Sequence, residues 1–380
     1  MSYNSFTRQQ MPSKHVIRTS DRIGFKKCRR QYDWSGIDRE NWVPLRGAKP
    51  LEFGTDCHAG WAAYYDPLTW DLLKSPATRD VVLQNVWVEY MKSHKKHHQK
   101  AIDASDYDTL GLEEEEDFAE RIILARGMFD NYFEWAPLED NFTPVQVEVD
   151  FEVPILDDKG EHYHCDCHGW PVYYQGRLDG IVKDEFGWYW ILEHKTTSVM
   201  GDTSHLVLDE QTGSYAWAVQ KMLGVRVLGV IYNEALKKVP HAPPELVSTR
   251  KGRNFSVAKD MDTTYDLYLE TITKAGEDIT LYEDMLKHLK TQGNKFLRRT
   301  SVHRNAEELA DIGHRIYQEA QDMLDPNLRI YPNPNRFTCG QCAFRTPCIA
   351  KNDGSDYEFL LNADFRQRST VEIEARRARV

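Results

Sequence analysis

The stretch GRLDGIVKDEFGWYWILEHKTTS, from Gly176 to Ser198, decides the fold. Two apolar, β-rich runs flank a short polar turn at Lys183–Gly187, which predicts a β-hairpin. The first run carries Asp179, and the second ends in Glu193–Lys195. An ionised carboxylate on a buried strand is costly unless it is paired or binds a cation. The hairpin is therefore predicted to hold charge at a site where a cation binds.

The two acidic residues of the hairpin are suited to a hard metal ion. On paired strands Asp179 and Glu193 come side by side, and convergent carboxylates favour Mg²⁺ or Mn²⁺, with the backbone carbonyl of His194 as a further ligand. Lys195 follows Glu193 by two residues, so both side chains point to the same face. Its ammonium group would orient a water or neutralise a phosphoryl group. Taken alone, this motif also fits a simple Lys–Glu pair on a half-exposed hairpin.

Two further features lie outside the hairpin. Gln211 and Tyr215, in DEQTGSYAWAV, stand one helical turn apart on one face and would position Lys195, a water or a phosphate. His58, in LEFGTDCHAGWAAYY, follows a glycine that permits a tight helix start. Each feature has an ordinary alternative, which is an amphipathic helix for the first and a core histidine for the second.

The seven cysteines are unevenly spaced. Cys339, Cys342 and Cys348 fall in FTCGQCAFRTPC, and Cys28 lies far upstream in GFKKCRRQYDW. Three close thiols and a distant fourth predict a metal that joins the two ends of the chain, either zinc or an iron–sulfur cluster. Cys165 and Cys167 lie in EHYHCDCHGW, where strict alternation would divide the ligands between two strand faces, so a structural or insertion role is expected there.

Composition limits the protein class. The chain has 380 residues and a net charge of -11, so a general basic coat for nucleic acid is excluded, although a local basic groove is not. It contains no apolar run of the roughly 18–20 residues that a membrane span needs. The N-terminal stretch lacks the apolar segment of a secretory signal, which predicts an intracellular, cytoplasmic protein.

Hydrophobic periodicity and turn signals predict an α/β fold with a helical N-terminal portion. Helices are predicted over Arg22–Trp34, Gly54–Tyr65, 70–100, 113–135, Asp209–Leu223, Thr263–His288 and Glu307–Leu324. Strands are predicted over Val145–Val153, Tyr173–Lys183, Trp188–Lys195, Val225–Asn233 and Lys295–Val302. The C-terminus is expected to be charged and frayed.

Together these motifs resemble a known family. GRLDGIV, ILEHKT and QTGSY resemble the successive motifs of RecB-like nucleases in the PD-(D/E)XK superfamily, and FGTDCHAGW resembles the upstream helix that supplies a metal-binding histidine. Cys28 with the C-terminal three resembles the cysteine staple of the iron–sulfur branch, which includes CRISPR-associated and AddB-type exonucleases. The resemblance extends from about Ser20 to Cys348, with the motifs in the expected order.

The resemblance implies a role for each matching residue. Asp179, Glu193 and His58 would bind Mg²⁺ or Mn²⁺, Lys195 would be the catalytic lysine, and Gln211 and Tyr215 would contact DNA or support the site. Cys28, Cys339, Cys342 and Cys348 would hold a structural 4Fe-4S cluster. Glu148 fits the position of an additional acidic residue in some relatives.

The fold implied is a restriction-endonuclease-like core, a central mixed β-sheet flanked by helices, with a cysteine-stapled C-terminus. The predicted divisions are an N-terminal arm (1–19), a helical region with Cys28 and His58 (20–143), the nuclease core (144–235), a helical region with a return strand (236–330), and an iron–sulfur segment with a tail (331–380).

The function implied is a metal-dependent DNA exonuclease acting on single-stranded ends in recombination, repair or CRISPR-adaptation-type processing, with partner proteins of those pathways. The chain lacks a GxxxxGK[ST] phosphate loop, so a stand-alone nuclease or an adaptation-type partner fits better than an ATP-driven machine. If a phage encodes it, it is expected to act in the host cytoplasm. The alternatives are a non-catalytic DNA-binding or assembly subunit of a recombination complex, and a zinc-stapled hydrolase of another phosphoester. Phosphate contacts and base stacking are predicted for Arg250–Arg253, Arg298, Arg299 and Arg304 with Phe255 and Phe296, with an ordinary solvated surface as the alternative for each.

Overall fold

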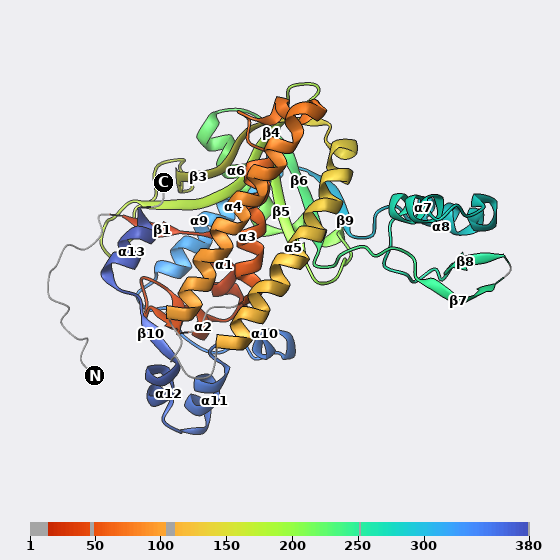
Figure 1. The fold of residues 1–380 in the computed structure, drawn as a ribbon. Helices are drawn as coiled ribbons and strands as arrows, with labels where there is room; N and C mark the ends of the chain where they lie inside the picture. The colour runs from red at the N-terminus through yellow and green to blue at the C-terminus, as the bar shows by residue number, and fades with distance from the viewer. Residues whose placement is uncertain (1–13, 46–48, 104–110, 251, 379–380) are drawn as a thin grey trace.

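A mixed sheet of six strands organises the computed structural model, which describes residues 14–378 except 46–48, 104–110 and 251 (Figure 1). The strands are β1 (His15–Ile17), β3 (Phe142–Pro154), β4 (Val172–Asp184), β5 (Tyr189–Thr197), β6 (Val227–Leu236) and β9 (Leu297–His303). The long strand β4 pairs antiparallel with β3 and β5 and parallel with β1. Beyond β5, the strand β6 runs parallel to it and β9 runs antiparallel to β6.

Helices cover both faces of the sheet. One core lies between the sheet and the helices α1 (Thr19–Lys27), α6 (Glu210–Leu223) and α9 (Ala306–Leu324). The other lies between the sheet and α3 (Lys49–Tyr64), α4 (Pro76–Asp103) and α5 (Gly111–Glu139). Strand β5 alternates between the two cores, with Ile191 in the first and Trp190 and Leu192 in the second. The predicted α/β fold with helices on a central mixed sheet is therefore confirmed.

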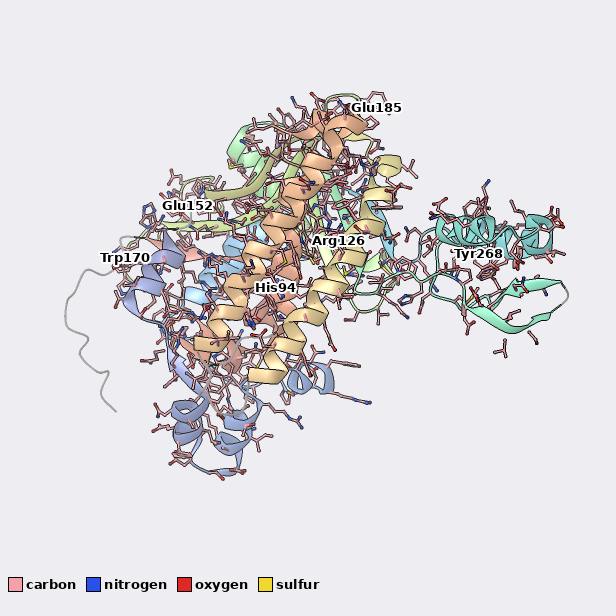
Figure 2. All side chains as sticks on the ribbon, viewed as in Figure 1. His94, Arg126, Glu152, Trp170, Glu185 and Tyr268 are labelled. Atoms are coloured by element: carbon pink, nitrogen blue, oxygen red, sulfur yellow. The ribbon has the colours of Figure 1, made fainter. Side chains whose placement is uncertain are left out.

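The remaining elements form an arm and a C-terminal lobe. The arm contains β7 (Glu245–Arg250), β8 (Arg253–Phe255), α7 (Tyr265–Lys274), η3 (Ile279–Tyr282) and α8 (Glu283–Gln292), and it projects away from the sheet (Figure 1). It has a small core of its own around the buried Tyr268 (Figure 2). The lobe contains α10 (Arg336–Gly340), α11 (Arg345–Asp353), α12 (Tyr357–Asp364), β10 (Phe365–Gln367) and α13 (Thr370–Arg377). Short connecting elements are α2 (Arg29–Ser35), β2 (Trp42–Pro44), η1 (Trp70–Lys74) and η2 (Ser204–Leu208).

Several predicted boundaries are wrong for local reasons. The single helix predicted over Arg22–Trp34 is two, α1 and α2, because the backbone at Cys28 is extended (φ −165°, ψ 113°). The helix predicted over Thr263–His288 is interrupted near Gly276, which has φ +71° and so ends α7. The C-terminus is not frayed over its described length, because α13 has a capping box at Ser369 and its Arg376 pairs with Asp21.

Some predictions reach beyond the described residues. Positions 1–13 of the predicted N-terminal arm, and Lys251 of the predicted phosphate-binding segment, lie outside that part of the chain. The described part of the predicted N-terminal segment 1–19 contains β1, a strand that the sequence pattern did not indicate. None of the helices in the described ranges is long and apolar enough to cross a membrane.

Candidate active site

The candidate site lies where strands β4 and β5 separate. The last paired residues are Gly180 and Leu192, and the next positions in this register are Asp179 and Glu193. Beyond that point His194 still pairs with Asn233 of β6, but β4 no longer pairs with β5, and the His194 N–H donates to Asp179 Oδ2 at 2.7 Å. A side-chain carboxylate therefore takes the place of a ladder carbonyl at the point where the hairpin opens.

A third carboxylate and a histidine converge on Asp179. Glu148 stands opposite Asp179 because the pairs on either side of it join Val147 to Gly180 and Val149 to Leu178. From helix α3, His58 Nδ1 lies 2.9 Å from Asp179 Oδ1. One ligand atom each from His58, Glu148 and Asp179 lies within 4.8 Å of the others.

The backbone at Glu148 is strained. It has φ +48°, in the left-handed region that a non-glycine residue occupies at a cost of about 1–2 kcal/mol. A local register irregularity precedes it in β3, between Pro144 and Gln146. Such strain is found where the surrounding structure requires a particular side-chain position, as it is in many binding sites.

Glu193 and Lys195 face helix α6. Lys195 Nζ donates to Glu193 Oε1 at 2.5 Å and to Gln211 Oε1 at 3.3 Å, and Gln211 Nε2 donates to the same Glu193 oxygen at 2.8 Å. Gln211 also donates to the hydroxyl of Tyr215 at 3.3 Å. The other oxygen, Glu193 Oε2, is buried and has no hydrogen-bond partner among the described residues. An unpaired buried carboxylate oxygen is costly, and a cation would satisfy it.

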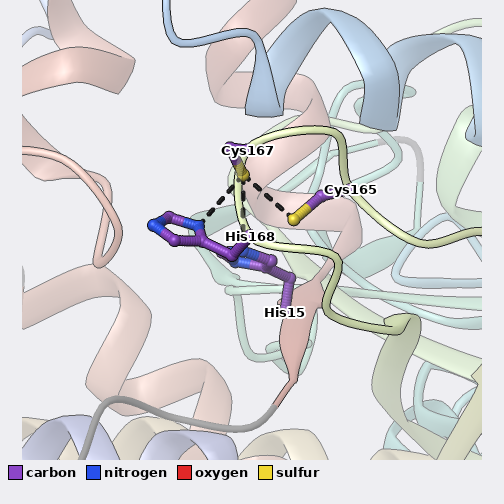
Figure 3. A group of neighbouring side chains, drawn as sticks. All are labelled: His15, Cys165, Cys167 and His168. Atoms are coloured by element: carbon purple, nitrogen blue, oxygen red, sulfur yellow. Dashed lines mark hydrogen bonds between the residues drawn. The ribbon is translucent and has the colours of Figure 1, made fainter.

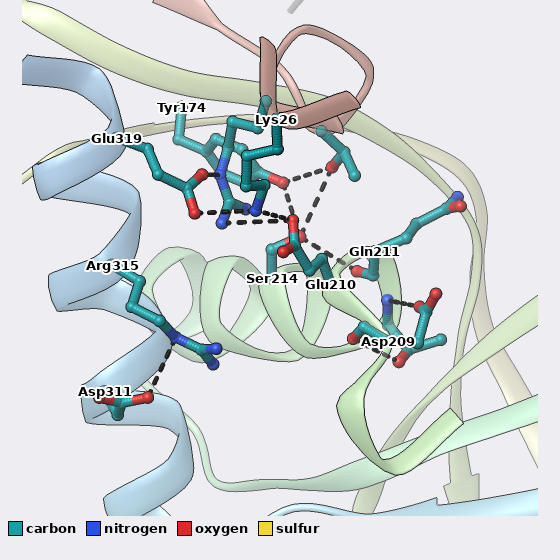
Figure 4. Close-up of polar contacts among 12 residues, drawn as sticks. Lys26, Tyr174, Asp209, Glu210, Gln211, Ser214, Asp311, Arg315 and Glu319 are labelled. Atoms are coloured by element: carbon teal, nitrogen blue, oxygen red, sulfur yellow. Dashed lines mark hydrogen bonds and ion pairs between the residues drawn. The ribbon is translucent and has the colours of Figure 1, made fainter. Parts of the chain in front are cut away.

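Helix α6 is fixed at its N-terminus, which places Gln211. Asp209 caps the helix by accepting from Thr212 N at 2.7 Å. The next residue, Glu210, pairs with Lys26 of α1, and Lys26 also pairs with Glu319 of α9 at 2.8 Å (Figure 4). Contacts from three helices therefore set the position of the side chain that holds Lys195 and Glu193 together.

The His194 side chain lies on the opposite face of β5. Its ring stacks on Trp61 with centroids 4.8 Å apart, and its Nδ1 accepts from Asn233 Nδ2 at 2.9 Å. Burial lowers its pKa to about 3, so the ring is neutral. The direct hydrogen bond between His194 and Asp179 comes from the backbone N–H, and the predicted role of the His194 carbonyl as a ligand stays a prediction.

The two carboxylates of the hairpin have pKa values displaced in opposite directions. Burial raises the pKa of Glu193 to about 7, and the charge of Asp179 adds to this against the opposing effect of Lys195. Burial also acts to raise the pKa of Asp179, but the neighbouring His58 outweighs it and holds the pKa at about 2. The pKa of Lys195 is raised, because Glu193 and Asp179 outweigh the burial that would lower it. Lys195 is thus a permanent cation at neutral pH.

These residues line one large cleft. Its volume is about 1480 Å³, and His58, Glu148, Asp179, Glu193, Lys195, Gln211 and Tyr215 all face it. Cationic side chains that the sequence analysis missed also line it: Arg18, Arg177, Lys237, Arg368 and Arg376. Arg177 could have been found from its place two residues before Asp179, but the others come from distant segments that only the fold brings together.

The cations and aromatic residues predicted to bind DNA are mostly placed elsewhere. Phe255 and Phe296 are core residues, with 6% and 1% of their surface exposed. Arg299 is buried against Asp140 at 2.6 Å, and Arg304 is buried and donates to the carbonyl of Leu206 at 2.8 Å. The prediction is wrong for these residues, because the charges satisfy buried acceptors and the rings fill the core.

Three cysteines of the predicted staple, Cys339, Cys342 and Cys348, belong to the C-terminal lobe, which contacts the segment that carries Cys28. Cys28 sits between α1 and α2, and its sulfur accepts from the backbone of Asn333 at 3.4 Å. Burial raises the pKa of Cys342, and the neighbouring thiols of Cys28 and Cys339 add to this. The Cys348 sulfur accepts from the Arg30 guanidinium at 3.4 Å, and Arg30 is only two residues from Cys28 in the chain. No three of these four described sulfurs lie within 4.8 Å of one another.

The model of the PD-(D/E)XK nuclease superfamily matches residues 23–349. The chain belongs to this superfamily. The match includes every strand of the site and reaches from α1 to α11. A search of the curated proteins found no match. For a PD-(D/E)XK nuclease the expected chemistry is metal-dependent hydrolysis of phosphodiester bonds in nucleic acid, and the group of His58, Glu148 and Asp179 fits a divalent cation.

Proposed function

We propose that this chain is a Mg²⁺- or Mn²⁺-dependent deoxyribonuclease that degrades single-stranded DNA from its ends, in recombination, repair or CRISPR-adaptation-type processing. The observation that carries the nuclease assignment is the group formed by His58 and the two carboxylates Glu148 and Asp179, together with the buried, unpartnered oxygen of Glu193 on the next strand. The restriction to single-stranded DNA ends rests on the resemblance to RecB-like exonucleases.

The residues divide into ligands and positioning groups. Asp179, Glu193 and His58 would hold the ion, with Glu148 as a further ligand. The ion would supply Lewis-acid activation of the phosphodiester and of the attacking water. Lys195, always protonated at neutral pH, cannot accept a proton, so it would offset the charge that develops on the phosphoryl oxygens. Gln211 would fix the relative positions of the Lys195 and Glu193 side chains through its hydrogen bonds to both.

The cleft would guide the DNA backbone. Arg18, Arg177 and Lys237 line it together with the carboxylates, so phosphates could be held on either side of the reacting bond.

We further propose that Cys28, Cys339, Cys342 and Cys348 hold a structural 4Fe-4S cluster. A single zinc ion needs sulfurs only about 3.8 Å apart, since each Zn–S bond is about 2.3 Å. No three of these four described sulfurs lie within 4.8 Å of one another, and a four-iron cluster binds each thiolate through a different iron. Iron and sulfide analysis of anaerobically purified protein tests this. Stoichiometric zinc without iron would contradict it.

The nuclease test compares Lys195→Ala with Lys221→Ala on end-labelled linear DNA in Mg²⁺ or Mn²⁺. Lys221 is exposed on α6 and outside the cleft, so it controls for the loss of one positive charge. Removing an electrostatic stabiliser is expected to slow cleavage by about 10²–10³-fold. Wild-type rates from a folded Lys195→Ala protein would refute the catalytic role. Degradation of circular single-stranded DNA at the linear rate would refute the requirement for ends.

A further inference from the structure

A second group of metal-binding side chains lies at the far end of β4, outside the nuclease site. It contains His15 of β1 with Cys165, Cys167 and His168 of the loop between β3 and β4 (Figure 3). One ligand atom from each lies within 4.8 Å of all the others. Cys167 Sγ is 2.9 Å from Cys165 Sγ, 3.1 Å from His168 Nδ1 and 3.9 Å from His15 Nε2.

A tight turn brings the loop ligands together. The sequence pattern suggested an alternating strand, which would separate Cys165 and Cys167 from His168. Instead the backbone closes a turn, in which Gly169 N donates to Cys165 O at 2.8 Å and Gly169 adopts φ +69°. The alternation ends at this turn, so the expected division of ligands between two faces is wrong.

The fourth ligand, His15, comes from β1, and its second ring nitrogen faces the carboxylate of Asp38. His15 is 5% exposed, and its backbone N–H donates to Pro171 O at 2.9 Å, which fixes β1 beside the loop. While Nε2 faces Cys167, Nδ1 lies 3.5 Å from Asp38 Oδ2. A carboxylate behind the second nitrogen of a histidine is the usual support of a metal-ligating imidazole.

We propose that His15, Cys165, Cys167 and His168 form a structural zinc site. Two thiolates and two imidazoles in a compact group suit tetrahedral Zn²⁺. Zinc would require the two sulfurs to separate to about 3.8 Å. This is a small adjustment, because Cys167 is only half-buried and His168 is exposed.

The site would join an edge strand to the wall of the nuclease cleft. Strand β1 pairs with β4 over only three residues, from His15 to Ile17, which is a weak attachment by itself. Directly after it, Arg18 lines the cleft and contacts the last turn of α13. A metal bound at His15 would hold β1 against β4. Loss of the metal should therefore make β1 more mobile without removing any residue proposed to act on the scissile phosphate.

The test is zinc binding by the reduced full-length protein, measured by elemental analysis and by competition with a chromogenic chelator. We expect Cys165→Ser/Cys167→Ser to bind one zinc equivalent fewer than wild type. Hydrogen exchange of the amides of β1 should become faster in that variant. A Cys342→Ser protein measured in parallel separates this site from the C-terminal cysteines and should retain the zinc.

A milder pair of variants keeps the proposal testable if the double variant fails to fold. His168 and His164 are both exposed on the same loop. His164 Nδ1 donates to the carbonyl oxygen of His162 at 2.8 Å, and His164 belongs to no ligand group among the described residues. His168→Asn should weaken zinc binding by at least tenfold, and His164→Asn should leave it unchanged. Equal zinc content and affinity in wild type, His168→Asn and the double variant would overturn the proposal.

Discussion

The raised pKa of Glu193 predicts that binding of a divalent ion is coupled to release of a proton. Because the pKa is about 7 in the metal-free protein, about ten of every eleven chains carry this proton at pH 6. A carboxylate must be deprotonated to act as a ligand, so the apparent affinity for Mn²⁺ should be about tenfold weaker at pH 6 than at pH 8. This corresponds to about 1.4 kcal/mol of binding free energy.

Calorimetric titration of the protein with Mn²⁺ measures this coupling without any nuclease assay. Titrations at pH 6 and pH 8, in two buffers of different ionisation enthalpy, give both the affinity and the number of protons released. Glu193→Gln is the matched control, because it keeps the shape of the side chain but cannot titrate. His58, whose pKa is also raised, since the attraction of Asp179 outweighs burial, would account for any pH dependence left in that variant. A wild-type affinity that is constant from pH 6 to pH 8 would refute the reasoning.

The same shift sets the pH dependence of stability in the metal-free protein. Between pH 4.5 and about 7 the folded state holds a proton on Glu193 that the unfolded state has lost. Stability therefore falls as pH rises through this window, by up to about 3 kcal/mol from this group. Glu193→Gln should remove that slope, and saturating Mn²⁺ should oppose it.

Two predictions concern the framework behind the site. Arg299→Met should cost about 3–5 kcal/mol in chemical denaturation, because it leaves the buried Asp140 carboxylate unpaired, and a loss below about 1 kcal/mol would show that the pair is not structural. Gly60→Ala should cost about 1–3 kcal/mol, because its new Cβ would lie 2.5 Å from the ring of Phe129. Gly24→Ala, with no atom within 4 Å of the new Cβ, should instead stabilise α1 by up to about 1 kcal/mol, and equal effects of the two alanines would contradict the packing argument.

Local patterns sufficed to predict the hairpin and its charged residues. Alternation and the turn at Lys183–Gly187 define β4 and β5, and the spacing of Glu193 and Lys195 places both on one face of a strand. Helical spacing likewise places Gln211 and Tyr215 together on α6. These inferences depend on neighbours within a few residues, and such short-range geometry is nearly independent of the rest of the fold.

The sequence could not show which distant segments are in contact, or whether each charged side chain is buried and paired or exposed to solvent. Arg299 and Arg304 look like surface cations in the sequence, yet both are buried because acceptors from other segments surround them. His15 carries no signal on its own, and it joins Cys165 and Cys167 only because β1 pairs with the start of β4. Long-range pairing of this kind is set by the whole topology and not by local propensity.

The candidate site departs from local structural rules at three neighbouring strand positions. Glu148 occupies a left-handed backbone conformation, Asp179 replaces a ladder carbonyl, and Glu193 buries an oxygen without a partner. The left-handed backbone of Glu148 and the unpaired oxygen of Glu193 each reduce the stability of the metal-free fold. They have a common explanation if one cation binds between the strands, because it would satisfy the buried oxygen and offset the repulsion between the carboxylates. On this reasoning the fold keeps the three carboxylates at the expense of its own stability, and binding of the ion restores what they cost.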